Sequence, residues 1–325
     1  MKTIRWGIIG CGSVTEIKSG PGFQLATSSS LVAVMRRNGD LAKDYARRHN
    51  VPTWYDRAED LIHDPDVDAV YIATPPNVHK DYTRLVAEAG KPVYVEKPMA
   101  LNFEECQDMI YACEQAGVPL FVAYYRRALP RFHKIKQVID SGVLGEIRGV
   151  NVTLYKPVQP EELTPHTLPW RVLPEISGGG HFIDLASHML DFLDDALGPI
   201  ESARGYATNQ AGLYPAEDMV TGSFVFESGV QGTGLWCSTA FDRLDHTEII
   251  GTKGKIAYAT FGNDPVELTT KAGTEKLSLE NPVHIQQPLI QTIVNSLNNQ
   301  GTCPSTGHTA ARTSRVMDQL LQNKK

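Results

Sequence analysis

Asp184 and His188 stand four residues apart in the segment 178–188, where three consecutive glycines precede an apolar helical pattern. Residues at positions i and i+4 lie on one face of an α-helix. An imidazole titrates near neutral pH and can pass a proton to or from a hydroxyl oxygen, while a nearby carboxylate can orient the ring. This spacing predicts acid–base chemistry on an alcohol or ketone. The alternative is a solvated helix face on which the pair has no chemical role.

His181 extends the pattern, because His181, Asp184 and His188 occupy positions i, i+3 and i+7. Two histidines and one carboxylate on a helix face form a possible metal site. Nothing else in the sequence requires a metal, so we predict none and keep the metal site as the alternative.

The cysteines form neither a CxxC motif nor a zinc spacing, and we interpret them as reduced thiols. They are Cys11, Cys106, Cys113, Cys237 and Cys303.

A glycine loop follows the first apolar run of the chain. Gly10 and Gly12 stand directly after this run, and a predicted helix starts at Ser13 and Val14. Backbone amides in such a turn can approach a pyrophosphate closely. Thr15 stands where the third glycine of a G-x-G-x-x-G fingerprint is expected. The loop predicts a dinucleotide site, and the alternative is a purely structural turn.

The residues after the second apolar run bear on the choice of cofactor. An acidic residue there would bind the ribose 2′-hydroxyl of NAD. The chain instead has Arg36 and Arg37, and the first acid is Asp40, which we interpret as a helix cap. Arginine forms bidentate, charge-assisted bonds with a phosphate. We therefore predict that NADP(H) is favoured over NAD(H), the alternative being two solvated surface arginines.

The first part of the chain must position these loops, and it alternates short apolar runs with amphipathic stretches. This pattern is typical of βαβ units and a parallel sheet. Predicted helices start near residues 13, 40, 56, 77 and 102. The apolar runs are residues 3–9, 31–35, 68–73, 92–96 and 120–123. We predict an α/β fold with a doubly wound, parallel Rossmann sheet in a dinucleotide-binding domain spanning residues 1–124.

The second part is predicted to be an α+β domain, residues 125–325, for substrate binding and oligomerisation, with a large, open, mostly antiparallel sheet. Its predicted strands are residues 150–155, 219–226, 230–237, 247–251 and 255–258. One face is expected to pack on the helix 179–197, and a tail helix is expected near residues 308–322. The other face lacks helices to cover it, which predicts a homodimer or homotetramer through the sheet. Trp236 and Phe224 are the predicted interface anchors.

Length and composition exclude several classes of protein. A chain of 325 residues favours two domains. No apolar run approaches the ~20 residues that span a bilayer, and no signal peptide is recognised, so we predict a cytoplasmic protein without membrane contact. A formal net charge of −6 argues against nucleic-acid binding. A small-molecule substrate is the predicted partner.

Further motifs mark the ends of the later strands and the loops of the second half. Thr74 and Pro75 are followed by His79, and the apolar run 92–96 leads into Glu96-Lys97-Pro98. Tyr125-Arg126-Arg127, Trp170-Arg171 and the glycine-led helix come after them. With these motifs, the chain resembles the glucose-fructose oxidoreductase / inositol dehydrogenase family, Gfo/Idh/MocA, over nearly its whole length.

The resemblance implies roles for individual residues. Lys97 is expected to polarise the reacting oxygen and to orient the nicotinamide, His188 to act as general acid/base, and Asp184 to orient it or to bind a hydroxyl. Some relatives carry tyrosine at the position of His188. The other cofactor-binding residues implied are Thr74, Pro75, His79 and Glu96, and the substrate-binding residues are Tyr125, Tyr155, Trp170 and Arg171. The alternatives are a surface role for Lys97 and a core role for Trp170.

We therefore predict an NADP(H)-dependent oxidoreductase that interconverts a secondary alcohol and a ketone on a sugar, a cyclitol or a related cyclic diol. Two alternatives remain open. A redox-assisted glycosidase would retain its nucleotide through dialysis. A non-catalytic nucleotide or sugar sensor of the same fold would not need Lys97, Asp184 and His188 together.

Overall fold

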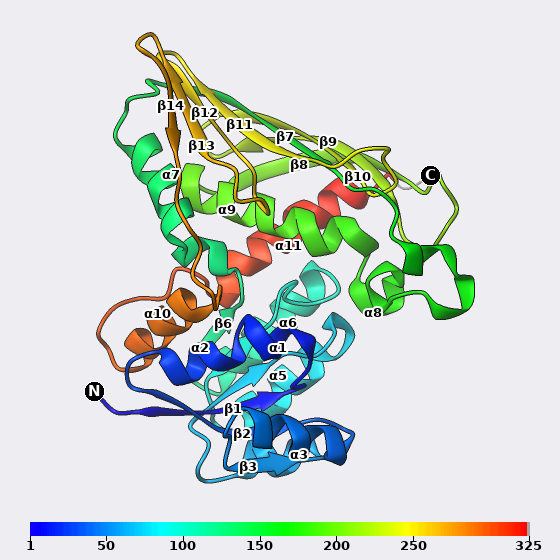
Figure 1. Cartoon of the computed structure of the whole chain (residues 1–325), viewed down its shortest axis with the longest axis vertical. Helices are drawn as coiled ribbons and strands as arrows, with labels where there is room; N and C mark the ends of the chain where they lie inside the picture. Colours follow the sequence, from blue (N-terminus) through cyan, green and yellow to red (C-terminus); the bar gives the residue numbers. More distant parts are fainter. Residues whose placement is uncertain (324–325) are drawn as a thin grey trace. The chain divides into compact units, whose positions relative to one another are not determined.

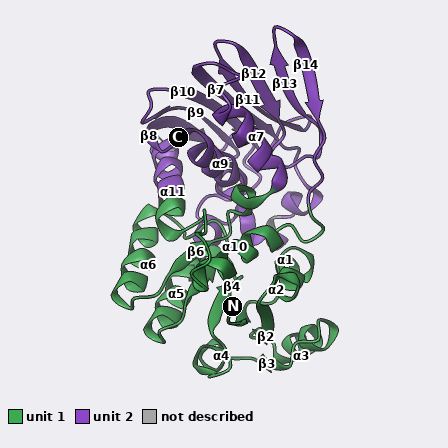
Figure 2. Cartoon of the chain, turned by 90° about the vertical axis from the view of Figure 1, so that its left-hand side faces the viewer, with its two compact units in different colours: residues 1–129, 282–311 green, residues 130–281, 312–325 purple. Residues whose placement is uncertain are grey.

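The computed structural model describes residues 1–323 as two compact units. Unit 1 comprises residues 1–129 and 282–311, and unit 2 comprises residues 130–281 and 312–325 (Figure 2). Unit 1 is discontinuous, because the chain returns to it after the strands of unit 2. The domain boundary expected after residue 124 stays a prediction.

Unit 1 contains a six-stranded sheet in which all strand pairs are parallel. Its spatial order is β3-β2-β1-β4-β5-β6. The strands are β1 (Ile4–Ile9), β2 (Ser29–Met35), β3 (Thr53–Tyr55), β4 (Ala69–Ile72), β5 (Val93–Val95) and β6 (Leu120–Val122). This arrangement confirms the predicted Rossmann sheet.

Helices of unit 1 cover both faces of this sheet (Figure 1). They are α1 (Ser13–Ile17), α2 (Gly20–Leu25), α3 (Gly39–Arg48), α4 (Ala58–His63), α5 (His79–Glu88), α6 (Phe103–Gln115) and α10 (Gln287–Leu297). A short 3-10 turn, η1 (Pro76–Val78), leads into α5, and η2 (Tyr125–Ala128) follows β6. The doubly wound arrangement follows from the alternation of apolar runs and amphipathic stretches.

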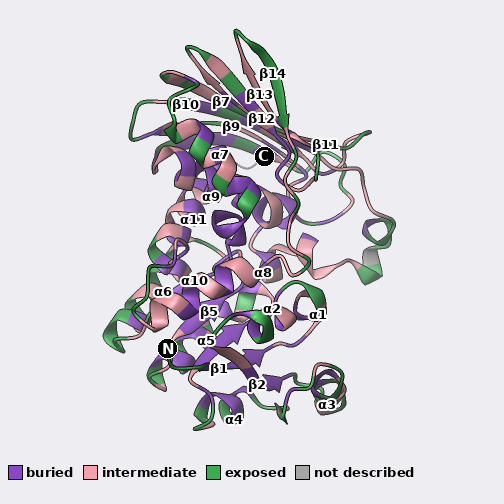
Figure 3. Cartoon of the chain, turned by 60° about the vertical axis from the view of Figure 1, so that its left-hand side comes forward, coloured by how far each residue is buried: buried purple, intermediate pink, exposed green. Residues whose placement is uncertain are grey.

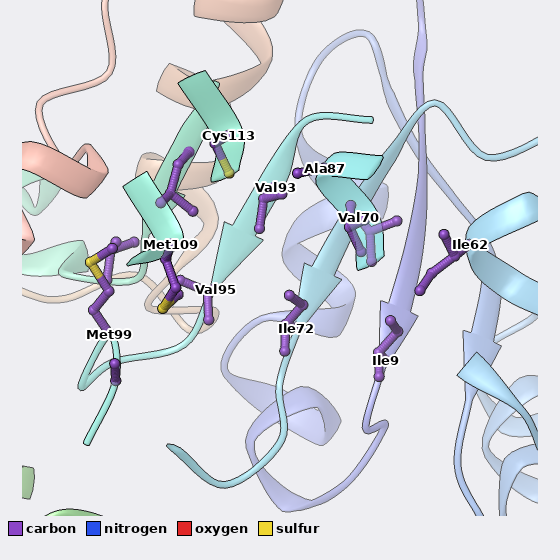
Figure 4. Packing of buried hydrophobic residues seen from close by; sticks show 14 of the residues in the cluster. Ile9, Ile62, Val70, Ile72, Ala87, Val93, Val95, Met99, Met109 and Cys113 are labelled. Atoms are coloured by element: carbon purple, nitrogen blue, oxygen red, sulfur yellow. The ribbon is translucent and has the colours of Figure 1, made fainter. Parts of the chain in front are cut away.

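The core on one face of the sheet is almost entirely aliphatic, with sulfur-containing side chains. Residues of successive strands, among them Ile9, Ile72 and Val95, belong to one cluster with Met109 and Cys113 of α6 (Figure 4). The opposite face is aromatic, since Phe23 of α2 packs on Trp6 with a ring-centroid distance of 4.9 Å and on Tyr71 at 5.2 Å. Burial on both faces explains why the strands read as continuous apolar runs.

Two details of unit 1 differ from the sequence predictions. The interpretation of Asp40 as a helix cap is wrong: Asn38 caps α3, and its side-chain oxygen accepts a hydrogen bond from the Leu41 amide at 3.2 Å. Asp40 lies in the first turn of α3, where its negative charge interacts favourably with the helix dipole. The edge strand β3 was not predicted, because its three residues are too short to produce a periodic pattern.

Unit 2 contains an eight-stranded sheet in the order β14-β13-β12-β11-β7-β10-β9-β8. The strands are β7 (Ile147–Tyr155), β8 (Ile200–Thr208), β9 (Met219–Phe226), β10 (Gln231–Cys237), β11 (Leu244–Gly251), β12 (Gly254–Tyr258), β13 (Val266–Thr270) and β14 (Gly273–Leu277). Only β7 and β10 pair in parallel among these described strands. The predicted large, mostly antiparallel sheet is confirmed, and β8, β13 and β14 add to it.

One layer of helices lies on one face of this sheet (Figure 1). The layer consists of α7 (Pro130–Asp140), α9 (Ser187–Leu197) and the unit 2 part of α11 (Gly307–Leu321), which matches the predicted tail helix. Aromatic rings join the layers: Phe182 lies 5.2 Å from Trp236, and Phe192 lies 5.8 Å from Tyr258. The remaining helical turns are η3 (Pro160–Leu163), η4 (Pro165–Thr167), η5 (Trp170–Val172), α8 (Pro174–Ser177) and η6 (Phe182–Ala186).

The prediction that Trp236 or Phe224 anchors a partner subunit is wrong. Both lie on the helix-covered face of the sheet, where they are 3% and 1% exposed. Tyr206 lies on the opposite face and is 66% exposed, and the burial pattern alternates accordingly along β8 to β10 (Figure 3). The period-2 alternation was recognised correctly, but the sequence did not tell which face the helices cover.

None of the helices in residues 1–323 is long and apolar enough to cross a membrane. The cysteines of this part of the chain are free thiols, and Cys237 alone among them is partly exposed.

Gly234 of β10 tests the packing of unit 2, because a Cβ atom at this position would collide with the ring of Trp236. We expect Gly234→Val to destabilise unit 2 by about 1–3 kcal/mol, the usual cost of overpacking. Urea denaturation followed by tryptophan fluorescence measures the change. Gly149→Ala is the control, since its Cβ would meet only the Gln231 carbonyl at 3.4 Å. Equal stability of the two variants would contradict this account.

Candidate active site

The carbonyl of Met35, at the end of β2, holds the glycine loop at the end of β1. It accepts hydrogen bonds from the amides of Gly10 at 2.9 Å and Cys11 at 3.1 Å. Gly10 has φ +91°, a left-handed conformation that favours glycine. A Cβ at Gly10 would also stand 2.8 Å from Thr74 Cγ2. The protein itself therefore requires glycine at this position.

Gly12 differs, because no packing within the chain requires it. Its backbone is extended, and a Cβ would meet only the Gly10 carbonyl oxygen, at 3.7 Å. The Gly12 amide donates to Thr15 Oγ1 at 3.0 Å, and this hydroxyl donates back to the Gly12 carbonyl at 2.9 Å. Thr15 thus closes the turn, and Ser13 and Val14 open α1. The space beside Gly12 is what a closely approaching phosphate needs.

Arg36 and Arg37 follow β2 and are both exposed. Burial raises the pKa of the Cys11 thiol to about 11, and the positive charge of Arg36 acts in the opposite sense. Arg36 directly follows Met35, whose carbonyl accepts the amides of Gly10 and Cys11, so the backbone of Arg36 lies beside the glycine loop. The structure thus brings together a loop with room for a phosphate and an exposed cation.

Thr74 ends the turn after β4, next to Gly10. Its buried Oγ1 has no hydrogen-bond partner among the described residues, which is uncommon for a buried hydroxyl. His79 is fully buried, and its Nε2 lies 2.8 Å from the Thr74 carbonyl oxygen. Its Nδ1 lies 3.1 Å from the carbonyl oxygen of Pro98. His79 therefore joins the turn after β4 to the one after β5, and Pro75 lies between Thr74 and η1.

Burial lowers the pKa of His79, and the surrounding carbonyls oppose this shift. Both ring nitrogens are engaged by the backbone, so His79 positions the loops and has no ring nitrogen left for a ligand. The cofactor-binding role that the family resemblance implied for His79 stays a prediction.

Glu96 and Lys97 follow β5 at the same edge of the sheet. The Glu96 side chain is 7% exposed, and its Oε2 accepts a hydrogen bond from the Lys97 amide at 3.0 Å. Lys97 is partly exposed and is followed by a cis peptide bond to Pro98. Parallel sheets bind ligands at the carboxyl ends of their strands. Four features of unit 1 lie there: the glycine loop, the two arginines, Thr74 and Lys97.

In unit 2, Asp184 and His188 lie on a helical segment that is not a regular α-helix. Residues 182–186 form the π-helical turn η6, and α9 begins at Ser187. The predicted α-helical spacing is therefore wrong in this turn, although both residues remain on one continuous helical segment. Ser177 Oγ accepts a hydrogen bond from the Gly180 amide at 3.1 Å, just before this segment. Single π-turns occur frequently at functional sites.

The surroundings of the two residues differ. His188 is 3% exposed, and its ring lies edge-on to that of Phe261 at 5.9 Å. Asp184 Oδ2 lies 3.4 Å from Arg171 Nε, and the Arg171 guanidinium stacks on Trp170 at 4.4 Å from the ring centroid. Trp170 is only partly buried, so it is not simply a core residue. The structure brings Trp170, Arg171 and Asp184 together.

His181 has a different set of partners. Its Nε2 lies 2.5 Å from Glu162 Oε1, which also accepts a hydrogen bond from Lys156 Nζ at 2.9 Å. Burial and the charge of Lys156 lower the pKa of His181, while Glu162 raises it. One nitrogen of His181 is thus engaged by Glu162, a residue outside the metal site considered from the sequence. Residues 1–323 hold no group of three or more His, Cys, Asp or Glu arranged for a metal.

Glu162 and Lys156 were not recognised from the sequence. Glu162 is 1% exposed and also accepts a hydrogen bond from the Gln159 amide at 2.9 Å. The Gln159–Glu162 spacing of a capping box was the available signal. Together with the Arg171–Asp184 pair, this cluster ties the segment 156–171 to the helical segment with Asp184.

The two remaining predicted substrate residues lie in different units. Tyr125 begins η2 in unit 1, is 7% exposed and stacks with Arg126 at 5.1 Å. Tyr155 ends β7 in unit 2 and is partly buried. The role of Tyr125 and Tyr155 in substrate binding stays a prediction.

Comparison with known proteins identifies the class. Residues 4–124 match the family model described as the oxidoreductase family with an NAD-binding Rossmann fold, and residues 132–257 match the model of the GFO/IDH/MocA C-terminal domain. The protein is therefore an oxidoreductase with a nucleotide-binding fold. The chain belongs to the Gfo/Idh/MocA family, as its motifs indicated.

Two curated relatives cover almost the whole chain. Oxidoreductase P35 of Formosa agariphila is 38% identical over 97% of both chains. The 1,5-anhydro-D-fructose reductase of Ensifer adhaerens is 28% identical over 93% of this chain and 91% of its own.

Solved structures share the fold. A levoglucosan dehydrogenase in complex with NADH and levoglucosan superposes with a TM-score of 0.86 at 22% identity, covering 98% of this chain and 96% of its own. KijD10 from Actinomadura kijaniata, a 3-ketoreductase in complex with NADP, has a TM-score of 0.85 at 18% identity over 100% and 98%.

Gly12 separates nucleotide binding from folding. We expect Gly12→Val to keep the thermal stability of the wild type, because a Cβ there makes no contact closer than 3.7 Å. The same side chain should obstruct the phosphates and weaken nucleotide binding by at least about tenfold, or 1.4 kcal/mol. Fluorescence titration with NADPH measures the affinity. Gly10→Val is the control that should lose stability. Unchanged nucleotide affinity of a folded Gly12→Val variant would contradict the assignment of the loop.

Proposed function

We propose that this protein transfers a hydride between NADP(H) and a secondary alcohol or ketone of a sugar, a cyclitol or a related cyclic diol. The observation that carries the proposal is the cluster at the strand ends of unit 1, where Lys97 follows β5 at the same edge of the sheet as the loop that has room for phosphates. Unit 2 contributes the groups for proton transfer. The protein is an oxidoreductase because it belongs to the Gfo/Idh/MocA family. What we propose beyond that is its cofactor preference and its substrate class.

The residues of unit 1 fit a dinucleotide. Gly12 leaves room for a pyrophosphate, and the buried Thr74 Oγ1 lacks a partner among the described residues. When bound, the nicotinamide would accept or supply the hydride. Gly10, Ser13, Val14, Thr74 and Pro75 would surround the phosphates and the adjoining riboses. Glu96 and His79 would act indirectly, by holding the backbone on which Lys97 and Thr74 stand.

Arg36 and Arg37 support NADP(H) over NAD(H). They occupy the strand end at which an acid would be required for the ribose 2′-hydroxyl, and that acid is missing. The influence of Arg36 on the Cys11 thiol is consistent with a guanidinium beside the phosphate-binding loop. Among structural neighbours, levoglucosan dehydrogenase holds NADH and KijD10 holds NADP, so the fold accepts either nucleotide.

The chemistry of the reaction suggests a role for each polar group. His188 would take the proton from the hydroxyl in oxidation and return it in reduction. Lys97 would donate a hydrogen bond to the same oxygen and stabilise negative charge that develops on it. Asp184, paired with Arg171, would accept a hydrogen bond from a neighbouring hydroxyl, and Trp170 would pack against the apolar face of a ring. Tyr125 and Tyr155 are proposed as further substrate contacts.

The proposed substrate class draws on the similar proteins. The names of the Ensifer reductase and of levoglucosan dehydrogenase both specify anhydro sugars as their substrates. A screen of sugars, anhydro sugars and cyclic diols for NADPH formation or consumption is the experiment that tests the proposal. Absence of turnover across all of them, by protein that binds nucleotide, would overturn it.

Lys97 and His188 should act on the chemical step. We expect Lys97→Ala and His188→Ala each to lower kcat by at least about a hundredfold while nucleotide affinity stays within about threefold. Steady-state kinetics and nucleotide titration measure the two effects. Circular dichroism confirms folding, and Lys253→Ala on the surface of unit 2 is the control. Near-normal turnover of folded His188→Ala would assign proton transfer to another group, such as Tyr155.

Arg36 should decide the cofactor. Replacing it with aspartate removes a phosphate partner and adds a carboxylate for a ribose hydroxyl. We expect Arg36→Asp to weaken NADPH binding at least about tenfold and to leave NADH binding equal or stronger. Arg57→Asp, at an exposed arginine of the same unit, is the control. Equal affinities of the wild type for NADH and NADPH would refute the proposed preference.

We also propose a homodimer formed by the open face of the eight-stranded sheet. Tyr206, Thr221, Leu235 and Thr153 are neighbours in one row across β8, β9, β10 and β7. Among the described residues of unit 2, no helix layer covers this face, and an isologous contact is the commonest arrangement of soluble homo-oligomers. Tyr206 replaces Trp236 and Phe224 as the proposed anchor, because it is exposed.

Light scattering tests the dimer. We expect the wild type to have twice the mass of one 35.8 kDa chain. Leu235→Glu should yield monomers, because the contact would bury a carboxylate without a partner of opposite charge. Tyr111→Glu, at a tyrosine of α6 that is 64% exposed, is the control and should remain dimeric. A monomeric wild type at micromolar concentration would disprove the proposal.

A further inference from the structure

Gln286 is a buried polar residue that the proposed reaction does not use. It precedes α10 in the segment that returns to unit 1, and it is 1% exposed. Its backbone amide donates to the Lys18 carbonyl at 3.1 Å, which fixes the start of the helix. Its side chain points away from water into the aromatic side of the unit 1 core. A buried amide of this kind needs specific partners.

Those partners lie around the carboxylate of Glu96. Gln286 Nε2 donates to Glu96 Oε1 at 2.6 Å, and the Tyr71 hydroxyl donates to the same oxygen at 2.5 Å. The Tyr94 hydroxyl donates to Gln286 Oε1 at 2.8 Å. Tyr71 and Tyr94 stack at 4.6 Å and are both fully buried. The four side chains form one polar network inside the core.

The network leaves one carboxylate oxygen for the backbone. Glu96 Oε1 takes both side-chain donors, and Oε2 accepts the Lys97 amide at 3.0 Å. Turning the carboxylate would leave buried donors without acceptors, which is energetically costly. The orientation of the carboxylate is therefore fixed, and through it the backbone at Lys97.

We propose that Gln286 and Tyr71 are positioning residues for Lys97, acting through the carboxylate of Glu96. The inference rests on the proposed function, in which Lys97 contacts the reacting oxygen. The returning segment of the chain thereby takes part in the site through a residue that contacts neither the cofactor nor the substrate. A lysine side chain has four rotatable bonds, so a fixed backbone is one of the few ways to direct its ammonium group.

Gln286→Glu is the sharpest test, because it changes one amide nitrogen into an oxygen. Two carboxylates then meet where an N–H···O bond of 2.6 Å existed. Like charges at such a distance cannot both remain ionised, so one carboxyl must take up a proton or Glu96 must turn away. At alkaline pH the Glu96 carboxylate should turn and release the Lys97 amide. At acidic pH the introduced carboxyl, once protonated, should donate as the amide did.

A second substitution should repair the first. In Glu96→Gln/Gln286→Glu the network has one charge again, and the amide at position 96 donates to the carboxylate at 286. The carbonyl oxygen at position 96 then accepts the Lys97 amide. The Tyr71 hydroxyl already lies 3.4 Å from the side-chain oxygen at position 286 and can donate to it.

The hydrogen-exchange rate of the Lys97 amide reports whether its hydrogen bond to Glu96 is intact, and it is measured without substrate or cofactor. We expect Gln286→Glu to speed this exchange at least about tenfold at pH 8 after correction for the intrinsic rate, and less at pH 6. The double variant should return to within about threefold of the wild type. Pro98 has no amide hydrogen, so no exchanging amide directly follows that of Lys97.

Kinetics form the second readout. We expect kcat of Gln286→Glu to fall at least about tenfold while the KM for nucleotide changes less than about threefold, with recovery in the double variant. Gln291→Glu is the matched control, because Gln291 lies on α10, the helix that Gln286 precedes, and accepts the Thr27 amide at 2.7 Å instead of contacting Glu96. It should leave both readouts unchanged.

The inference is overturned if the Lys97 amide of folded Gln286→Glu exchanges at the wild-type rate. It is also overturned if the double variant recovers neither the exchange rate nor kcat, or if Gln291→Glu changes both as Gln286→Glu does. If Gln286→Glu does not fold, Tyr71→Phe takes its place, and wild-type exchange in that variant is equally decisive. Lys97→Ala that retains full turnover would instead refute the proposed function, while the exchange measurement would still decide whether the network holds the backbone.

Discussion

The site depends on a constraint of the parallel sheet: all six strands of unit 1 end at the same edge. Backbone groups there have no further strand to pair with, and they bind the neighbouring loops instead. The Met35 carbonyl accepts the amides of Gly10 and Cys11, and His79 links the turns after β4 and β5. The loops at this edge are therefore held by short-range contacts, while their outer surfaces stay available to a ligand.

Unit 2 is built on an open sheet that is covered by helices on one face. Its strands bury one face under α7, α9 and α11, and aromatic pairs such as Phe182 and Trp236 fill the space between the layers. The helical segment that carries Asp184 and His188 belongs to this layer, so the sheet holds it in place. The π-helical turn interrupts the regular spacing between them. Buried ionic contacts, centred on Glu162, attach the neighbouring loop to the same segment.

Buried polar networks recur beside the proposed catalytic groups. Glu96 is surrounded by Tyr71, Gln286 and the Lys97 amide in unit 1, and Glu162 by Lys156 and His181 in unit 2. Such groups are costly to bury unless every hydrogen bond is made, and when satisfied they specify one arrangement. Each network lies one or a few residues from a group that the proposed reaction needs in a defined direction.

The sequence by itself determined the local features: the apolar runs of the parallel sheet, the loop with Gly10 and Gly12, and the Glu96-Lys97 motif. These depend on neighbouring residues and on strand or helix periodicity, which a sequence displays directly. Tertiary structure decided which sheet face the helices cover, and it placed Trp236 inside. It also brought Gln286 to Glu96 across 190 positions of the chain. Contacts between distant segments leave no periodic signal, because they arise only when the chain returns to a core that is already defined.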